Sequence, residues 1–370
     1  MFLSSISLVN IRKHIETKIE FAKELNYIVG ENGVGKTTIL EAIYYLCTTK
    51  SCVTSFDSEA VRFGESGFLI KGKMSSRTED NVQIGYSLAE NKKMYSLNNK
   101  QISKFSEIIG KFPLVLLSPA DHSITQGYPS ERRKFVDSVI SQSNKTYLEI
   151  LIEYNRSLKQ RSYLLGRIRE NNYHRSDELE AWNEILVKNG SEIIRYRKEF
   201  ISEFVPYITD SYRTILSQKE KPEIQYHYLG GTSTEDVEET FTKQLKQKEE
   251  DEIRRGINLV GPHKDDFIFN VNDMNLKSYG SQGQHKTFQT MLRFAEYFYL
   301  RDKTGTSPLF LLDDVFGELD AERASAISNY LSTIGQAIIT LTDFGNISYL
   351  KVGKEDKIIK LNINGEVRYA

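Results

Sequence analysis

Hydrophobic and polar residues alternate over the first part of the chain. The alternation runs through residues 3–11, and a second, mostly apolar run covers residues 25–29 and ends at Gly30. Both patterns are typical of β-strands. From residue 37 to residue 47 the apolar positions recur at helical spacing instead, with no proline or glycine among them. The glycines after residue 29 are therefore predicted to connect a strand to a helix.

Later segments differ in their patterns. Period-two stretches around turn residues between residues 68 and 97 predict antiparallel hairpins and a β-subdomain. Residues 130–204 have the pattern of long charged helices, and residues 230–251 that of a polar turn and a further charged helix. Strand character returns at residues 267–269. The order of elements predicts an α/β fold interrupted by a mostly helical insertion.

Length and composition limit the class of protein. A chain of 370 residues has room for two or three domains, and its 39% hydrophobic and 27% charged residues are typical of a soluble globular protein. The N-terminus lacks the pattern of a signal peptide, and no apolar run approaches the roughly 18 residues of a membrane span. We expect a cytoplasmic protein with no membrane partner. Cys47 and Cys52 match no metal-ligand spacing and are expected to be reduced packing residues.

A complete phosphate-loop pattern follows the second apolar run and opens the predicted helix. Glycine is needed there because the backbone has to curl around phosphate with its N–H groups pointing inward. Lys36 is expected to reach the β- and γ-phosphates of ATP, and the Thr37 hydroxyl suits Mg²⁺. A fortuitous glycine turn is the alternative. The residues predicted to bind the nucleotide are Gly30, Glu31, Asn32, Gly33, Val34, Gly35, Lys36, Thr37 and Thr38.

A second motif ends a later apolar strand. Residues 308–312 deliver two adjacent carboxylates, Asp313 and Asp314, which is the pattern of a Walker B strand. Asp313 is predicted to hold Mg²⁺ together with Thr37, and Asp314 to polarise the attacking water. The alternative is that the pair only caps the following turn or helix.

A serine-glycine loop precedes a strongly amphipathic segment late in the chain. Ser281, Gly283 and Gln284 of this loop can offer a hydroxyl, backbone N–H groups and a helix N-terminus to a second phosphate site. One chain cannot easily wrap both loops around one γ-phosphate, so we expect two subunits, each presenting Ser281 to the ATP held by Lys36 of the other. Asp320 stands where a D-loop crosses that interface. Ordinary helix capping by Ser281 is the alternative.

The three motifs together resemble the RecF family, within the ABC ATPases of the SMC and Rad50 group. Residues 117–121, 127–137 and 260–266 also resemble that family, so the resemblance spans nearly the whole chain. It implies that Arg12, at the end of the first strand, approaches the nucleotide. A surface arginine at a strand end is the alternative.

The resemblance also implies a domain organisation. The expected fold is an ABC-type P-loop ATPase head with an antiparallel β-subdomain, formed by residues 1–120 and 255–370. A mostly helical arm domain is expected to be inserted at residues 121–254. Lys36, Asp314 and Ser281 are the residues expected to carry catalysis.

The resemblance implies that the function is that of an ATP-dependent DNA-binding protein. The resemblance implies a homodimer held by ATP on duplex DNA or at single-strand/double-strand junctions. With RecO and RecR it would help load RecA in gap repair, replication and the SOS response. Hydrolysis would be weak and stimulated by DNA. Asp314 is shorter than the glutamate of transporters, and Thr342 and Asp343 replace their switch histidine, so slow turnover is expected.

Three alternatives stay open from the sequence alone. An ABC transporter subunit would share the nucleotide loops but not the long insertion. A RecF-like ATPase of a phage-defence system would have different partners. A scaffold with a vestigial ATP site would show negligible turnover.

The residues that would contact DNA cannot be chosen from the sequence. The net charge of −1 offers no general attraction to nucleic acid, so a DNA-binding surface requires local segregation of charge. Each basic candidate could equally lie on a solvated helix face. The candidates are Arg132, Arg133, Lys134, Lys159, Arg161, Arg167 and Arg169.

Overall fold

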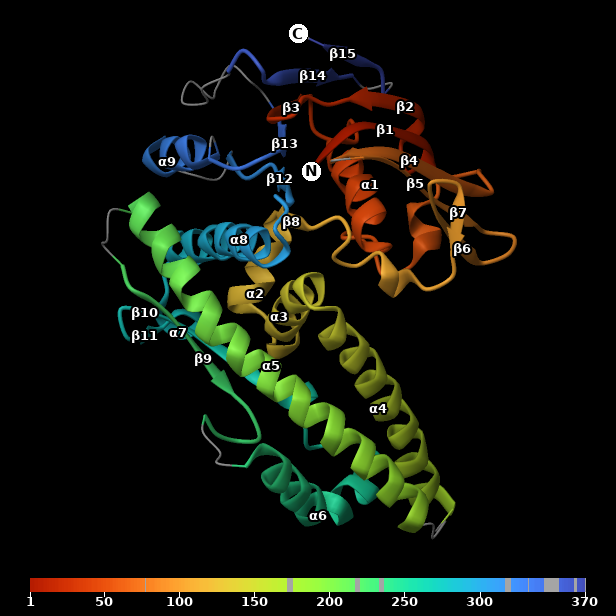
Figure 1. The fold of residues 1–370 in the computed structure, drawn as a ribbon, viewed down its shortest axis with the longest axis vertical. Coiled ribbons are helices and arrows are strands. Elements are labelled where there is room, and N and C mark those ends of the chain that lie inside the picture. The colour runs from red at the N-terminus through yellow and green to blue at the C-terminus, as the bar shows by residue number, and fades with distance from the viewer. Residues whose placement is uncertain are drawn as a thin grey trace. The chain divides into compact units, whose positions relative to one another are not determined.

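A computed structural model describes residues 1–76, 78–171, 176–216, 220–232, 236–316, 321–331, 333–342, 353–362 and 365–369 (Figure 1). The chain forms two compact units. The first unit comprises Met1–Asp121, Arg213–Ser217 and Leu292–Ala370, and the second comprises His122–Tyr212 and Gln218–Met291. None of the described helices is both long and apolar enough to cross a membrane.

The first unit contains a mostly parallel sheet with the strand order β15-β14-β3-β13-β12-β8. Only β15 runs antiparallel to its neighbour. The central strands are mostly apolar and buried, because a parallel sheet is covered on both faces. The bounds are β3 (Leu25–Val29), β8 (Leu114–Leu117), β12 (Leu309–Asp313), β13 (Ala337–Leu341), β14 (Lys357–Leu361) and β15 (Val367–Tyr369).

A second sheet of the first unit is antiparallel, with the order β2-β1-β4-β5-β6-β7. It contains the predicted hairpins. Helix α1 (Lys36–Thr48) packs against strands of both sheets, so its two faces contribute to one hydrophobic core. The buried Gln336 amide links β1 to the start of β13, since it accepts from Leu3 N at 2.7 Å and donates to Leu3 O at 2.8 Å. The strand bounds are β1 (Phe2–Ile11), β2 (His14–Glu20), β4 (Gly67–Ser75), β5 (Glu79–Ser87), β6 (Lys92–Leu97) and β7 (Lys100–Ile102).

Short helical turns and two later helices complete the first unit. The turns are η1 (Asp57–Ala60), η2 (Phe105–Glu107) and η3 (Pro119–Asp121). Helix α9 (Ala321–Leu331) follows the Walker B strand, and α8 (Gln282–Thr304) contributes its part from Leu292 onward.

The second unit is mainly helical, as the sequence predicts. Its two longest helices lie side by side (Figure 1), with the rings of Tyr147 and Tyr196 5.6 Å apart. A three-stranded antiparallel sheet has the order β11-β10-β9. The bounds are α2 (His122–Gln126), α3 (Pro129–Ser143), α4 (Lys145–Asn171), α5 (Ser176–Leu216), β9 (Pro222–His227), α6 (Val237–Arg255), η4 (Pro262–Lys264), β10 (Asp266–Val271), β11 (Met274–Asn275) and α7 (Leu276–Tyr279).

The compact units do not follow the predicted domain boundary at residue 255. Residues 255–291 cluster with the second unit, although the sequence placed them in the head. The physical reason is strand pairing: β10 is hydrogen-bonded to β9 along its whole length, with Asp266 opposite His227 and Val271 opposite Pro222. This pairing brings residues 266–271 next to residues 222–227, so both strands cluster in one unit. The Ser281 loop therefore lies in the second unit.

Several basic residues proposed for DNA contact are structural members of the second unit. Arg161 is fully buried and forms an ion pair with Glu252 at 2.6 Å. Arg132 is buried against Asp266 at 2.8 Å, and Arg133 donates to Asp265 O at 2.6 Å. Buried charges need such partners because desolvation is costly. Arg132 and Arg161 are thus excluded as exposed DNA ligands.

Candidate nucleotide site

The phosphate loop connects β3 to α1, as its sequence pattern predicts. Gly33 has φ 79° and Gly35 φ 103°, both in the left-handed region that favours glycine. A Cβ at Gly30 would lie 2.5 Å from Leu361 O. Gly35 stands at the N-cap of α1, and its carbonyl accepts from Thr38 N and Ile39 N. The glycines are therefore required by the backbone path itself.

The side chains of the loop divide between surface and interior. Glu31, Asn32 and Thr37 are exposed, whereas Val34 and Thr38 are buried. Because Glu31, Asn32 and Thr37 are exposed to solvent, the interior of the loop is lined by its backbone, which can curl around a ligand.

Lys36 is turned back onto the loop. Its Nζ donates to Gly30 O at 2.6 Å and to Glu31 O at 2.9 Å, and the residue is only 7% exposed. Burial lowers the pKa of the ammonium, and the charges of Asp314 and Asp313 oppose that shift. The ammonium thus occupies the centre of the loop, where phosphate oxygens would compete with the two carbonyls.

Thr37 and Asp313 meet as predicted. The Thr37 hydroxyl donates to Asp313 Oδ1 at 3.1 Å. The pair brings a hydroxyl and a carboxylate oxygen together from elements far apart in sequence. Such oxygens are the ligands that a hard cation prefers, so the donor set fits Mg²⁺.

The sequence reasoning missed Thr340, which lies opposite Asp313 in the pairing of β12 with β13. Its hydroxyl donates to Asp313 Oδ1 at 2.7 Å and accepts from Asp314 N at 2.9 Å. Asp314 has φ 50°, in the left-handed region. Thr340 therefore holds the carboxylate of one aspartate and the strained backbone of the next. Only the strand register could have revealed it.

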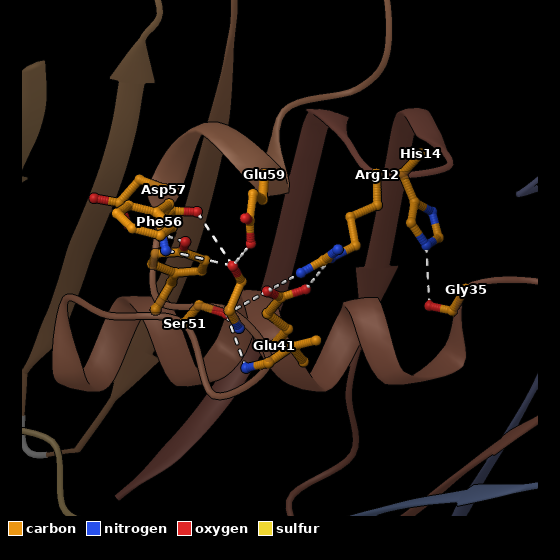
Figure 2. Close-up of polar contacts among 11 residues, drawn as sticks. Arg12, His14, Gly35, Glu41, Ser51, Phe56, Asp57 and Glu59 are labelled. Atoms are coloured by element: carbon orange, nitrogen blue, oxygen red, sulfur yellow. Dashed lines mark hydrogen bonds and ion pairs between the residues drawn. The ribbon is translucent and has the colours of Figure 1, made fainter. Parts of the chain in front are cut away.

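Arg12 lies beside α1 and is paired with an acidic residue of that helix (Figure 2). Its Nε and Nη2 donate to the two carboxylate oxygens of Glu41 at 2.6 and 2.9 Å. The buried Glu41 also accepts from the Ser51 hydroxyl. This bidentate pair raises the pKa of Arg12. Its guanidinium is thereby fixed in direction, although part of it stays exposed.

His14 is a second residue that the sequence did not indicate. Its Nε2 lies 3.1 Å from Gly35 O (Figure 2). Its Nδ1 lies 2.8 Å from Thr17 Oγ1. Burial lowers the pKa of the imidazole, which favours the neutral ring. A neutral ring satisfies both contacts when Nε2–H donates to Gly35 and Nδ1 accepts from Thr17. His14 therefore supports the last turn of the phosphate loop.

The Ser281 loop has a helix cap at its centre. The Ser281 hydroxyl accepts from Gln284 N at 3.2 Å, and Gln284 Oε1 accepts from Ser281 N at 3.0 Å. This reciprocal arrangement is a capping box at the start of α8. The cap uses the hydroxyl oxygen as an acceptor, and its O–H is still able to donate to a phosphate. The Gln284 amide also donates to Glu220 Oε1 at 3.0 Å.

The structure brings some of the predicted residues together. Lys36, Thr37 and Asp313 share the first unit, with Asp314 adjacent, whereas Ser281, Gly283 and Gln284 belong to the second. Asp320 and Asp343 lie outside the described residues.

A phosphate loop before α1, facing an acidic strand end in a parallel sheet, defines the nucleotide site of a P-loop nucleotide-binding protein. The model of the RecF/RecN/SMC N-terminal domain family matches residues 2–348. A DNA replication and repair protein RecF of Chloroherpeton thalassium is 40% identical over 365 residues, which cover 95% of this chain and 99% of that protein. The chain belongs to the RecF family, a family of ABC-type ATPases.

Further comparisons agree with that assignment. The RecF protein of Salinibacter ruber is 38% identical over 354 residues, with 93% of this chain and 86% of that protein covered. A solved structure of the recombination mediator protein RecF with ATP, in the RecFOR pathway, matches with a TM-score of 0.91. It is 31% identical and covers 100% of this chain and 97% of that one. An Smc head domain derived from Pyrococcus furiosus shares the fold, with a TM-score of 0.55 and 16% identity.

Proposed function

We propose that this protein is an ATP-dependent DNA-binding protein that works in DNA replication and recombinational repair. The contact of Thr37 with Asp313 carries the proposal, because it joins the phosphate loop to the Walker B strand in one site. The names of the RecF relatives support the repair role, and the RecF structure solved with ATP supports the nucleotide.

ATP would bind along the loop, with its phosphates on the backbone N–H groups and the N-terminus of α1. Lys36 would exchange its two carbonyl contacts for phosphate oxygens. Thr37 and Asp313 would hold Mg²⁺, which neutralises charge that develops on the phosphates. Asp314 would orient the attacking water, with its backbone held by Thr340. Arg12 would add a cation near the nucleotide.

We infer that a second chain completes the site. Ser281, Gly283 and the N-terminus of α8 would meet the γ-phosphate of ATP bound to the other subunit, with Asp320 at the interface. ATP then contacts both subunits in one state only, and hydrolysis removes the affinity that holds the homodimer. Helix capping by Ser281 does not compete with this role, because the cap uses only the oxygen of the hydroxyl.

The dimer would bind duplex DNA or single-strand/double-strand junctions through phosphate contacts, and DNA would stimulate a weak hydrolysis. RecR and RecO are the proposed partners, and RecA loading the outcome. The names of the relatives do not favour a transport or phage-defence role. A measured turnover above background would exclude a scaffold without hydrolysis.

Sedimentation of the full chain with ATP and Mg²⁺, with and without a gapped duplex, tests the mechanism. Wild type is expected to shift from monomer to dimer on ATP addition and to comigrate with DNA. Lys36→Met is expected to stay monomeric, because it loses the cation in the loop. An unchanged mass for wild type that binds ATP, even with DNA, would refute the role of Ser281 in the partner's site.

A further inference from the structure

Helix α4 carries segregated charge. Between residues 155 and 169 it has five basic residues and no acidic one, in a chain whose net charge is −1. Surface helices usually mix the two signs at spacings of three and four residues. This segment therefore differs from an ordinary solvated helix face.

The contacts of the five cations divide them into two groups. Arg161 is buried against Glu252, and Arg169 donates to Arg255 O at 3.2 Å and pairs with Glu170. The side chains of Arg161 and Arg169 therefore stabilise the second unit. The other three are Arg156, Lys159 and Arg167.

The three remaining cations lie on one face of α4 together with a tyrosine. Residues 156, 159, 163 and 167 are three or four positions apart, the spacing of one helical face. From the first to the last they extend over about 16 Å. Over that length one strand of duplex DNA presents about five phosphates. We call Arg156, Lys159, Tyr163 and Arg167 the basic stripe.

The side chains of the basic stripe are accessible. Arg156 and Lys159 are exposed, and neither side chain makes an ion pair or a hydrogen bond with the described part of the chain. Tyr163 is 68% exposed, and the Arg167 guanidinium lies 5.9 Å from the centre of its ring. An exposed aromatic ring on the same helical face as the exposed Arg156 and Lys159 suits a ligand that is both anionic and able to pack against a ring.

We propose that the basic stripe contacts the sugar-phosphate backbone of DNA. Charge complementarity favours a polyanion, and contacts to phosphate position a protein without reading sequence. The proposal rests on the DNA-binding function proposed above and adds the surface that carries it. Among the candidates from the sequence it removes the buried Arg132 and Arg161, keeps Lys159 and adds Arg156.

Helix α6 provides a matched control. Lys243 and Lys246 are exposed cations of the same unit, on a helix that also carries six acidic residues. Reversing both changes the net charge by the same amount as reversing Arg156 and Lys159. Only the position of the charges differs.

The test compares the full chain with two double variants, R156E/K159E and K243E/K246E. Affinity for a fluorescent gapped duplex is measured by anisotropy with ATP and Mg²⁺ at several KCl concentrations. The stripe variant is expected to bind at least about tenfold more weakly near 0.1 M salt, with a salt slope smaller by about 2. The α6 variant is expected to keep the wild-type slope. Equal melting temperatures show that all three proteins fold.

The outcomes separate the stripe from the proposed function. If wild type fails to bind DNA, the proposed function itself is wrong. If wild type binds and the stripe variant matches it in affinity and slope, the DNA-binding function stands and the basic stripe is not its surface. An equal loss in both variants would also overturn the inference, because net charge alone would then explain it.

Discussion

Thr340 connects the two aspartates at the end of β12, and its contacts explain why a threonine stands at a fully buried strand position. One hydroxyl serves the Asp313 carboxylate and the Asp314 amide. A buried amide without a partner costs about 1–3 kcal/mol. The residue therefore links the stability of the strand end to the placement of the metal-binding carboxylate.

Thr340→Val keeps the shape of this side chain and removes its hydroxyl. We expect the free energy of unfolding to fall by about 1–3 kcal/mol, and the Mg²⁺ concentration for half-maximal ATP hydrolysis to rise. Thermal melting and the Mg²⁺ dependence of phosphate release measure the two effects. Thr340→Ser is the control, because it keeps the hydroxyl. A serine variant as defective as the valine variant would show that the methyl group, not the hydroxyl, is important.

The site residues that the sequence predicted share one property: they belong to short local patterns. The phosphate loop and Asp313 could be found because neighbouring residues in the chain define them. Thr340 and His14 could not, because their partners are fixed by strand register and by the approach of β2 to the loop. Arg161 was a candidate for DNA contact, but the structure buries it against Glu252. A basic residue in a charged helix gives no sequence signal of such burial.

At the scale of elements, the start of α8 depends on a residue that lies far from it in the sequence. Glu220, just before β9, accepts from the Gln284 amide and so directs the amide oxygen towards Ser281 N. The sequence offered capping and phosphate binding as alternatives for Ser281. The capping box uses the hydroxyl only as an acceptor, so capping and the proposed donation to a phosphate are compatible.

Glu220→Ala should loosen that loop without touching the phosphate loop. We expect ATP affinity of the monomer to stay unchanged and the ATP-dependent dimer to dissociate roughly tenfold more readily, the effect of losing one charge-assisted hydrogen bond. Nucleotide titration and sedimentation measure the two quantities separately. Glu220→Gln keeps an acceptor oxygen and should restore most of the dimer. Weaker ATP binding by the monomer would contradict this assignment.

The sequence predicted which segments form helices and strands better than it predicted which elements belong to the same compact unit. Helical spacing located the arm, and alternation located the hairpins. The pairing of β10 with β9 was not predictable, because nearly forty residues that include α6 separate the two strands. That long-range pairing is what moves residues 255–291 into the second unit.

At the scale of the whole molecule, stability should depend on pH through His263. Its Nδ1 contacts the Tyr154 hydroxyl at 2.7 Å, and burial lowers its pKa to about 4. An unfolded histidine titrates near 6.5, so between about 6.5 and 4 the unfolded chain binds the proton more strongly than the folded chain. The folded state therefore loses roughly 3 kcal/mol from this residue as the pH falls from 7 to 4.

Asp265 changes the stability with pH in the opposite direction to His263, and a variant of His263 separates the two contributions. Burial raises its pKa to about 6, so its contribution to stability is lost as the pH rises through 6. His263→Gln leaves Asp265 in place and removes only the histidine. Trp182, the one tryptophan of the chain, packs on the α4 leucines of the second unit, so its fluorescence in urea reports the unfolding of that unit. As the pH is lowered, the free energy of unfolding of wild type should fall relative to that of His263→Gln. If the free energies of the two proteins change with pH in parallel, His263 is not buried in its neutral form.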